Sequence, residues 1–291
     1  MKIIFTFFLI IQIVSFNAQT KDELIKKIID YNVFESDCIG IACAPSEQYN
    51  NFKKLKSIIS SEELIQLSKH EQPVIRAYTS SELINLNKNP IELFIFEIDK
   101  DEKVETQDGC IGDYEALSSI VYNAYRGKIT LESISSKDSD DKIRKRKIEN
   151  ALSNDKTLQK LDSIILYSNK DLYWLYYFNI LEKKKVSENH IKRILDLAFK
   201  QNNSYAFDYI LTNYPEKHQL EIRDYFENTF LTANFDSENK VRYLDRFIEY
   251  LLATNREDYR QLCIKKLQRD QYWKNHLNWI EDKLKKYNLV F

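Results

Sequence analysis

Residues 241–252 read VRYLDRFIEYLL, and the spacing of their apolar side chains decides the fold class. The apolar residues recur at intervals of three and four, which places them on one face of an α-helix. They are Val241, Leu244, Phe247, Ile248, Leu251 and Leu252. A helix with such a stripe gains most of its stability when a neighbouring element covers the stripe. The pattern therefore predicts a protein of packed helices.

The same spacing recurs through the second half of the chain, in residues 191–199, 222–230, 259–267 and 273–287. The whole sequence contains only 4 glycines and 4 prolines, where ordinary usage would give about 20 and 15. So few turn-forming residues indicate helices joined by short polar loops. We expect an all-α fold, an elongated α-solenoid of stacked helical hairpins, and for this second half a compact helical bundle is the alternative.

Capping residues and prolines predict several helix boundaries in the first half of the chain. Ser60 and Glu63 have the spacing of a capping box, in which each side chain binds the backbone N–H of the other residue. Pro73 and Pro90 suit the first turn of a helix and end the helix before them. We therefore expect short helices that begin after Ser60, at Pro73 and at Pro90.

Three other segments of the first half are assigned from their patterns. Residues 21–31 are expected to form a first short helix, and residues 37–45 are expected to be irregular. Residues 91–98 keep helical spacing, although the alternation of their first apolar residues leaves a strand open as the alternative.

Residues 60–86, with EQPVIRAY (71–78) at their centre, resemble a HEAT-type repeat. In that family a short helix ends in an acidic link, and the next helix opens with a Pro-Val-Arg-like stretch. Residues 101–114 resemble the following unit in secreted bacterial proteins of this kind, although Thr106 stands where the first unit has an arginine. The resemblance covers roughly residues 37–125. It implies a superhelical binding scaffold and supplies no catalytic residues.

Composition divides the chain into an N-terminal helical, HEAT-like region, residues 19–132, and a C-terminal region of helical hairpins, residues 142–291. The segment between them, residues 133–141, is rich in serine and aspartate and is expected to be a polar linker. The C-terminal hairpins are expected to continue the solenoid.

The first 18 residues have the pattern of a secretory signal peptide. Lys2 is followed by an apolar run from Ile3 to Phe16 and by the small residue Ala18. This run of about 14 residues is shorter than the roughly 20 that a membrane span requires. We expect cleavage after Ala18 and a periplasmic or secreted protein without stable membrane insertion, and an N-terminal anchor helix is the alternative.

The charge balance argues against a nucleic-acid partner. The chain has 43 basic and 44 acidic residues, for a formal net charge of −1, so it has no overall positive field to attract an anionic polymer. A basic run at residues 142–147 is interpreted as a solvated helix face.

Four cysteines allow three pairings in an oxidising compartment. Cys38 and Cys43 flank a short segment that could close a small loop, and they are the candidate disulfide. A bridge from Cys43 to Cys110 and a chain of free thiols are the alternatives. Cys263 lies on the apolar face of a helical pattern and is expected to be a buried free thiol.

The aromatic run 173–178, YWLYYF, is the candidate binding feature. A packed central helix would explain these six large residues, because they surround a helix instead of following one stripe. The functional alternative is that Tyr173, Trp174 and Tyr177 open onto a groove and stack on a sugar or peptide.

Catalytic and metal motifs are not found in the sequence. Its 4 histidines are widely spaced, with neither His-Glu-x-x-His nor paired Cys-x-x-Cys motifs, so we expect no metal and no cofactor. The sequence also lacks a Gly-x-Ser-x-Gly elbow and a phosphate-binding glycine loop. Cys110, between Gly109 and Ile111, is the one cysteine considered as a thiol nucleophile.

These observations favour an exported helical-repeat scaffold that binds a protein partner in the cell envelope, without enzymatic activity. A hydrolase or transferase acting on an envelope polymer is one alternative. A neutralising partner of a secreted toxin is another.

Signal cleavage can be tested directly on the exported protein. Mass spectrometry of the intact chain is expected to show Gln19 as the first residue, or Thr20 if the cleavage site shifts by one. A chain that retains Met1 after export would contradict this assignment.

Overall fold

The computed structural model describes residues 19–135, 140–181 and 186–289, and the chain divides into two compact units. Unit 1 ends at Leu161 and unit 2 begins at Asp162, within helix α9 (Lys156–Tyr167). The expected signal peptide and residues 136–139 of the expected linker lie outside the described residues. The boundary therefore falls some way beyond the polar segment 133–141.

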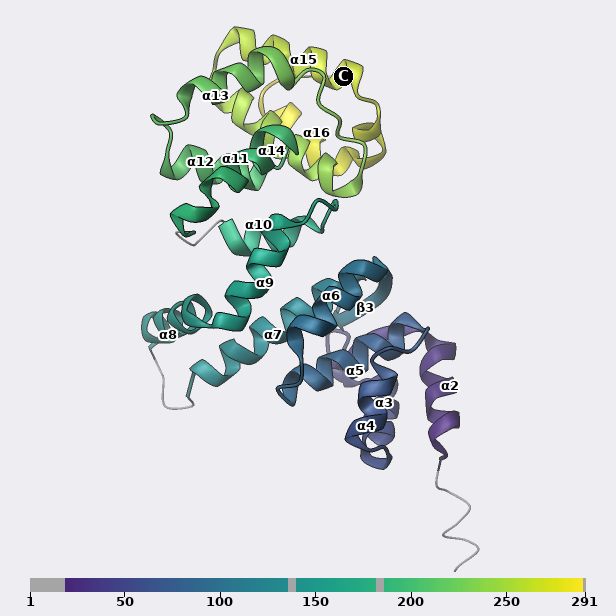
Figure 1. Cartoon of the computed structure of the whole chain (residues 1–291). Helices are drawn as coiled ribbons and strands as arrows, with labels where there is room; N and C mark the ends of the chain where they lie inside the picture. The colour runs from purple at the N-terminus through teal and green to yellow at the C-terminus, as the bar shows by residue number, and fades with distance from the viewer. Residues whose placement is uncertain (1–18, 136–139, 182–185, 290–291) are drawn as a thin grey trace, which may run out of the picture. The chain divides into compact units, whose positions relative to one another are not determined.

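Unit 1 is built mainly of helices, with one small sheet (Figure 1). Its helices are α2 (Lys21–Tyr31), α3 (Glu47–Ile58), α4 (Ser61–Leu67), α5 (Pro73–Asn85), α6 (Pro90–Lys100), α7 (Leu117–Ser133), α8 (Asp141–Asn154) and the first part of α9. Its strands are β1 (Val33–Ile39), β2 (Ala44–Pro45), β3 (Lys103–Gly109) and β4 (Ile111–Ala116).

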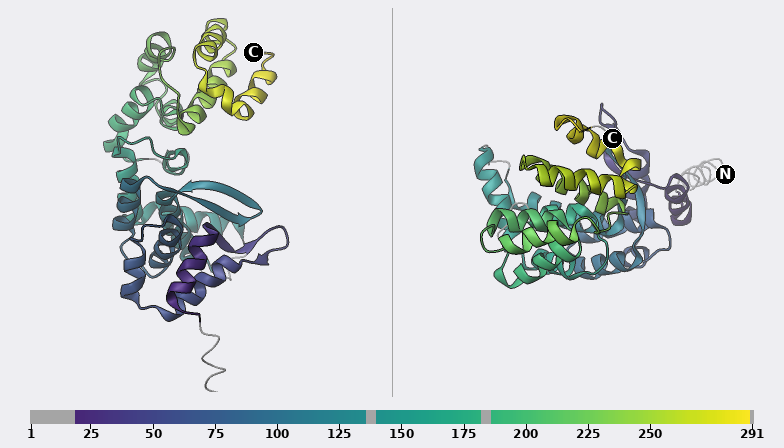
Figure 2. Two further views of the ribbon diagram at one scale, coloured as in Figure 1. Left: turned by 90° about the vertical axis from the view of Figure 1, so that its right-hand side faces the viewer. Right: turned by 90° about the horizontal axis from the view of Figure 1, so that it is seen from above.

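The sheet of unit 1 has the strand order β2-β1-β3-β4. β1 and β3 run parallel, with Val33 beside Glu105, whereas the β1–β2 and β3–β4 pairs are antiparallel. Figure 2 (left) shows both antiparallel hairpins extending beyond the helices of the unit. β4 is an edge strand, and most of its side chains are exposed.

The mostly helical character is confirmed, but the all-α prediction is wrong for residues 33–45 and 103–116. Residues 101–114, interpreted as a second helical repeat unit, contain the β3–β4 hairpin instead. In β3, Val104 and Thr106 are buried while Lys103 and Glu105 are exposed, which is the two-residue alternation of a strand. The parallel partner of β3 lies far away along the sequence, so local spacing gave no sign of it.

Asparagine takes the place of glycine at many turns of this chain. In the described residues, eight positions other than glycine have positive φ, and six of them are asparagine. They are Asn32, Asn87, Asn89, Asn202, Asn255 and Asn288. Asparagine tolerates the left-handed region better than other residues with a Cβ. The use of asparagine at these positions explains how a chain with only 4 glycines ends so many helices.

The helix signals read from the sequence are confirmed. Ser60 caps α4 with its hydroxyl and Glu63 completes the capping box. Pro73 and Pro90 open α5 and α6, and residues 91–98 are helical. The helix expected over 21–31 is α2.

A buried arginine joins three segments of unit 1. The Arg76 side chain in α5 is 0% exposed, and its Nε donates to Glu97 Oε1 in α6 at 3.0 Å. Its Nη1 donates to the carbonyl oxygens of His70 and Glu71 at 2.8 and 2.9 Å, and its Nη2 bonds the carboxylate of Glu102. Arg76 therefore holds the α4–α5 link, α6 and the residue before β3 in one arrangement.

The described residues of unit 2 form helices and the loops that join them, without a strand. It contains the end of α9 and then α10 (Trp174–Leu181), α11 (Ile191–Lys200), α12 (Ser204–Asn213), α13 (Gln219–Asp224), α14 (Glu238–Ala253), α15 (Glu257–Arg269) and α16 (Leu277–Lys286). Phe207, Phe226, Phe230 and Phe247 are at most 1% exposed and form the centre of an aromatic core.

None of the helices in residues 19–135, 140–181 and 186–289 combines the length and apolar character needed to cross a bilayer.

The Arg76 network predicts a large stability effect. The change Arg76→Ala is expected to lower the free energy of unfolding by about 3–5 kcal/mol, because Glu97 stays buried without its cation. The control Lys56→Ala breaks the more exposed pair with Glu82 and should cost at most about 1 kcal/mol. Urea unfolding followed by circular dichroism measures both changes. Equal effects of the two variants would contradict the role given to Arg76.

Candidate binding site

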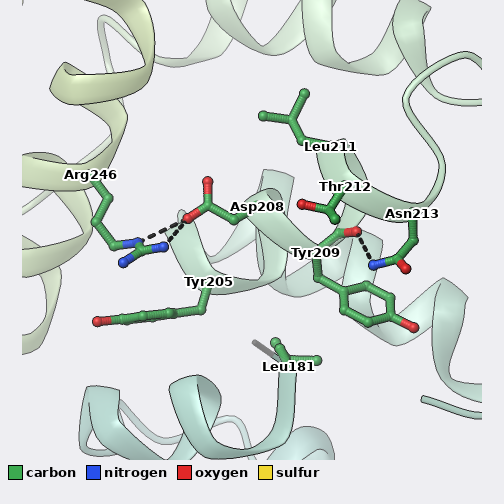
Figure 3. Close-up of a pocket in the computed structure, with 8 residues that line it drawn as sticks. All are labelled: Leu181, Tyr205, Asp208, Tyr209, Leu211, Thr212, Asn213 and Arg246. Atoms are coloured by element: carbon green, nitrogen blue, oxygen red, sulfur yellow. Dashed lines mark hydrogen bonds and ion pairs between the residues drawn. The ribbon is translucent and has the colours of Figure 1, made fainter. Parts of the chain in front are cut away.

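Unit 2 contains a pocket of about 290 Å³ to which α10, α12 and α14 contribute side chains. Most of its lining comes from α12 (Figure 3). The lining residues are Leu181, Tyr205, Asp208, Tyr209, Leu211, Thr212, Asn213 and Arg246. The pocket therefore combines aliphatic and aromatic walls with polar groups, the usual composition of a ligand site.

A stack of two aromatic rings and two arginines adjoins the pocket and contributes Tyr205 and Arg246 to its lining. The rings of Trp174 and Tyr205 stack at 5.9 Å between centroids, with an interplanar angle of 17°. The Arg246 guanidinium lies 4.3 Å from the centroid of Tyr205, and the Arg242 guanidinium lies 4.8 Å from that of Trp174. Each contact of this kind contributes on the order of 0.5–1.5 kcal/mol. The stack therefore fixes the relative positions of α10, α12 and α14.

Asp208 orients Arg246, the arginine of the stack that contacts Tyr205. Arg246 Nε donates to Asp208 Oδ2 at 2.9 Å, and Arg246 Nη2 bonds the same oxygen. About one third of each side chain is exposed, so solvent limits what the pair adds to stability to about 1 kcal/mol or less. Its main effect is geometric. Figure 3 shows that the pair lies to one side of the Tyr205 ring plane, with the guanidinium above the ring.

Asn203 fixes the start of α12 and thereby the position of Tyr205. Its buried Oδ1 accepts hydrogen bonds from the backbone N–H groups of Tyr205 and Ala206, both at 3.1 Å. Its Nδ2 donates to the Tyr243 hydroxyl in α14 at 3.2 Å. The preceding Asn202 adopts a left-handed conformation, which turns the chain between α11 and α12.

The start of α10 is held by α14. The backbone N–H of Trp174 donates to Asn239 Oδ1 at 3.1 Å. Asn239 lies in the first turn of α14, so the same helix that carries Arg242 and Arg246 also places the Trp174 ring.

The two tyrosines of the pocket are neutral hydroxyls at physiological pH. Burial raises the pKa of Tyr205, and the neighbouring arginines lower it by less. Burial also raises the pKa of Tyr209, whose hydroxyl accepts a hydrogen bond from the backbone N–H of Val186 at 3.0 Å. Neutral phenols can exchange hydrogen bonds with a ligand, but because their pKa is raised they rarely ionise near neutral pH and are poorly suited to act as general bases there.

The three aromatic residues predicted from the sequence lie in different environments. Trp174 is half-buried and belongs to the stack, and Tyr173 is half-buried with its ring 5.6 Å from that of Trp174. Tyr177 is only 2% exposed and packs against Tyr243, and burial raises its pKa. Tyr177 is therefore part of the core, as the packed-helix interpretation of the run has it, and does not face a groove as the functional alternative has it.

Tyr205, Asp208 and Arg246 were not identified from the sequence. Tyr205, Asp208, Tyr209 and Thr212 follow helical spacing along α12, and Arg242 and Arg246 are four residues apart on α14. These are ordinary patterns in a chain with 30% charged residues. Their meaning depends on α12 lying beside α14, and no local pattern specifies which helices are neighbours.

The cysteines occupy two kinds of environment. Cys38 and Cys43 form a disulfide with Cα atoms 4.6 Å apart, and Cys110 is an exposed free thiol. Cys263 is free and buried, as its position on an apolar helix face predicted. Burial raises the pKa of the Cys263 thiol to about 12, which makes it unreactive at neutral pH.

Neither a metal-ligand cluster nor a similar known protein indicates what this pocket binds. Within the described parts of the chain, no three His, Cys, Asp or Glu side chains converge as metal ligands. No protein-family model matches the chain, and no curated protein or solved structure is significantly similar to it. The geometry of the pocket is therefore the basis for a proposal about function.

The role of Asn203 can be measured through stability. The change Asn203→Ala removes the cap of α12 and the bond to Tyr243, and it should lower the free energy of unfolding by about 1–2 kcal/mol. Asn203→Asp keeps the capping oxygen and should cost less. Urea denaturation of the three proteins tests this order. An alanine variant as stable as the parent would show that the cap does not hold α12.

Proposed function

We propose that this chain is a protein-binding scaffold that uses the pocket of unit 2 to receive one anchor side chain of its partner. The stack of Arg242, Trp174, Tyr205 and Arg246 beside the pocket is the observation that supports the proposal. Tryptophan, tyrosine and arginine are the residues that most often dominate the energetics of protein interfaces. Here they are already ordered, so a partner would not have to pay for ordering them.

The size of the pocket favours a single side chain as its occupant. Sites for small-molecule ligands usually enclose about 300–1,000 Å³, and this pocket lies at the lower limit with about 290 Å³. Leu181, Leu211 and the tyrosine rings supply the apolar walls that an aliphatic or aromatic anchor needs. The exposed Thr212 and Asn213 supply donors and acceptors for the partner's backbone.

Binding agrees better with these residues than catalysis does. The carboxylate of the pocket, Asp208, is bonded to Arg246, and the tyrosines are neutral. Hydrolysis of a polymer would require an acid or base poised near neutral pH.

The stacked-hairpin architecture and the exported location belong to the same proposal. Within unit 2, α11 packs on α12 and α14 packs on α15, as consecutive helices do in HEAT-type hairpins. The signal pattern at residues 1–18 indicates that the partner is another protein of the cell envelope or its surroundings.

The proposal can be tested by filling the pocket with a bulky side chain and measuring the affinity of bound peptides. A displayed peptide library is selected on the mature protein, and the affinities of the enriched peptides are measured. The change Thr212→Trp places a bulky ring at the exposed edge of the pocket, and it is expected to weaken the selected peptides at least about tenfold, or roughly 1.4 kcal/mol.

The matched control is Leu220→Trp, which adds a ring to an exposed residue that does not line the pocket. This variant should bind the peptides as the parent does. Selection of no peptide, or selection of peptides that bind the Thr212→Trp protein at full affinity, would exclude the pocket as the binding site.

A further inference from the structure

Three of the four cysteines meet at one end of the sheet of unit 1. Cys38 is near the end of β1, Cys43 follows in the β1–β2 turn, and Cys110 lies in the β3–β4 turn. The two turns are directly bonded, because the Gly40 N–H donates to the Gly109 carbonyl oxygen at 2.8 Å. The parallel pairing of β1 and β3 thus brings together cysteines that are far apart in the sequence.

Cys38 lies on the strand next to β3, whereas Cys43 is one strand farther from β3 and from Cys110. Ile39 pairs with Gly109 in the parallel ladder, so Cys38 lies one residue before this pair and Cys110 lies one residue after it. The two cysteines are therefore diagonal neighbours across adjacent strands, offset by two residues along the strand direction. Cys43 adjoins β2, and β1 separates β2 from β3 in the strand order. Cys110 therefore approaches the bridge from the side of Cys38.

Both turns are open to solvent and lightly packed. The flanking side chains of Ile41 and Ile111 are 98% and 75% exposed. Gly40 and Gly109 have positive φ, and a Cβ built on either would meet no atom within 4 Å. The neighbouring structure therefore leaves room for small movements of either turn.

We propose that Cys110 is the attacking thiol of an intramolecular thiol–disulfide exchange with the Cys38–Cys43 bridge. The Cys110 thiolate attacks Sγ of Cys38, the Cys38–Cys43 bond breaks, and Cys43 leaves as a thiolate that takes up the proton lost by Cys110. The product has a Cys38–Cys110 disulfide and a free Cys43. One disulfide and one thiol are present before and after the step, so the exchange needs no external oxidant.

The exchange changes what the disulfide constrains. The Cys38–Cys43 bridge closes only one small loop, whereas a Cys38–Cys110 bridge would link the two hairpins covalently. The site lies in unit 1 and involves none of the residues of the pocket. The exchange is therefore tested independently of the proposed function.

Tryptic mapping distinguishes the two forms. Cys38 and Cys43 share the tryptic peptide 28–53, and Cys110 lies in peptide 104–126. The mature protein is incubated without reductant at mildly alkaline pH, its thiols are alkylated, and it is then digested. We expect a fraction of molecules with 28–53 linked to 104–126, formed at a rate independent of protein concentration. The rate should fall at acidic pH, because the thiolate is the nucleophile.

Single-cysteine variants supply the controls. Cys110→Ser should abolish the linked peptides, whereas Cys263→Ser should leave their amount unchanged. In a glutathione redox buffer, Cys43→Ser should form the bridge between peptides at least tenfold more often than Cys38→Ser. Linked peptides that are absent from the parent protein, or that appear in proportion to protein concentration, would overturn the proposal. Equal bridging in the two variants would overturn the attack on Cys38.

Discussion

Two stacked rings, Trp174 and Tyr205, each in contact with a guanidinium, determine how three helices of unit 2 are arranged. The rings come from α10 and α12, and both arginines come from α14. Because ring stacking and cation–π contacts depend on geometry, they restrict the helices more closely than aliphatic packing would. The pocket lies beside this stack, and Tyr205 and Arg246 belong both to the stack and to the pocket lining.

Unit 1 depends on a different constraint. The buried Arg76 binds the carboxylates of Glu97 and Glu102 and two backbone carbonyl oxygens, and it thereby holds the helices against the beginning of β3. A charge taken out of water is tolerated only where such partners surround it. The β1–β2 hairpin carries the disulfide at its turn, and the β3–β4 hairpin carries the exposed thiol at its turn.

Sequence patterns predicted the helices well because each signal is local. The Ser60 capping box, the two helix-opening prolines and the stripe around Val241 act within a few residues of their own position. The sheet escaped prediction because β1 and β3 become strands by pairing with each other across a long stretch of chain. For the same reason Trp174 could be selected from its aromatic run, whereas Arg246 could not. An arginine on an amphipathic helix has no distinguishing feature until the helix beside it is known.

We propose that the ordered stack and its pocket form the binding surface of the protein. Hydrogen–deuterium exchange of the mature chain, with and without a peptide selected for binding, tests it most directly. We expect slower exchange in residues 174–181 and 204–213 when the peptide is bound, with little change in unit 1. Protection confined to unit 1, or absent from both of these helices, would contradict it.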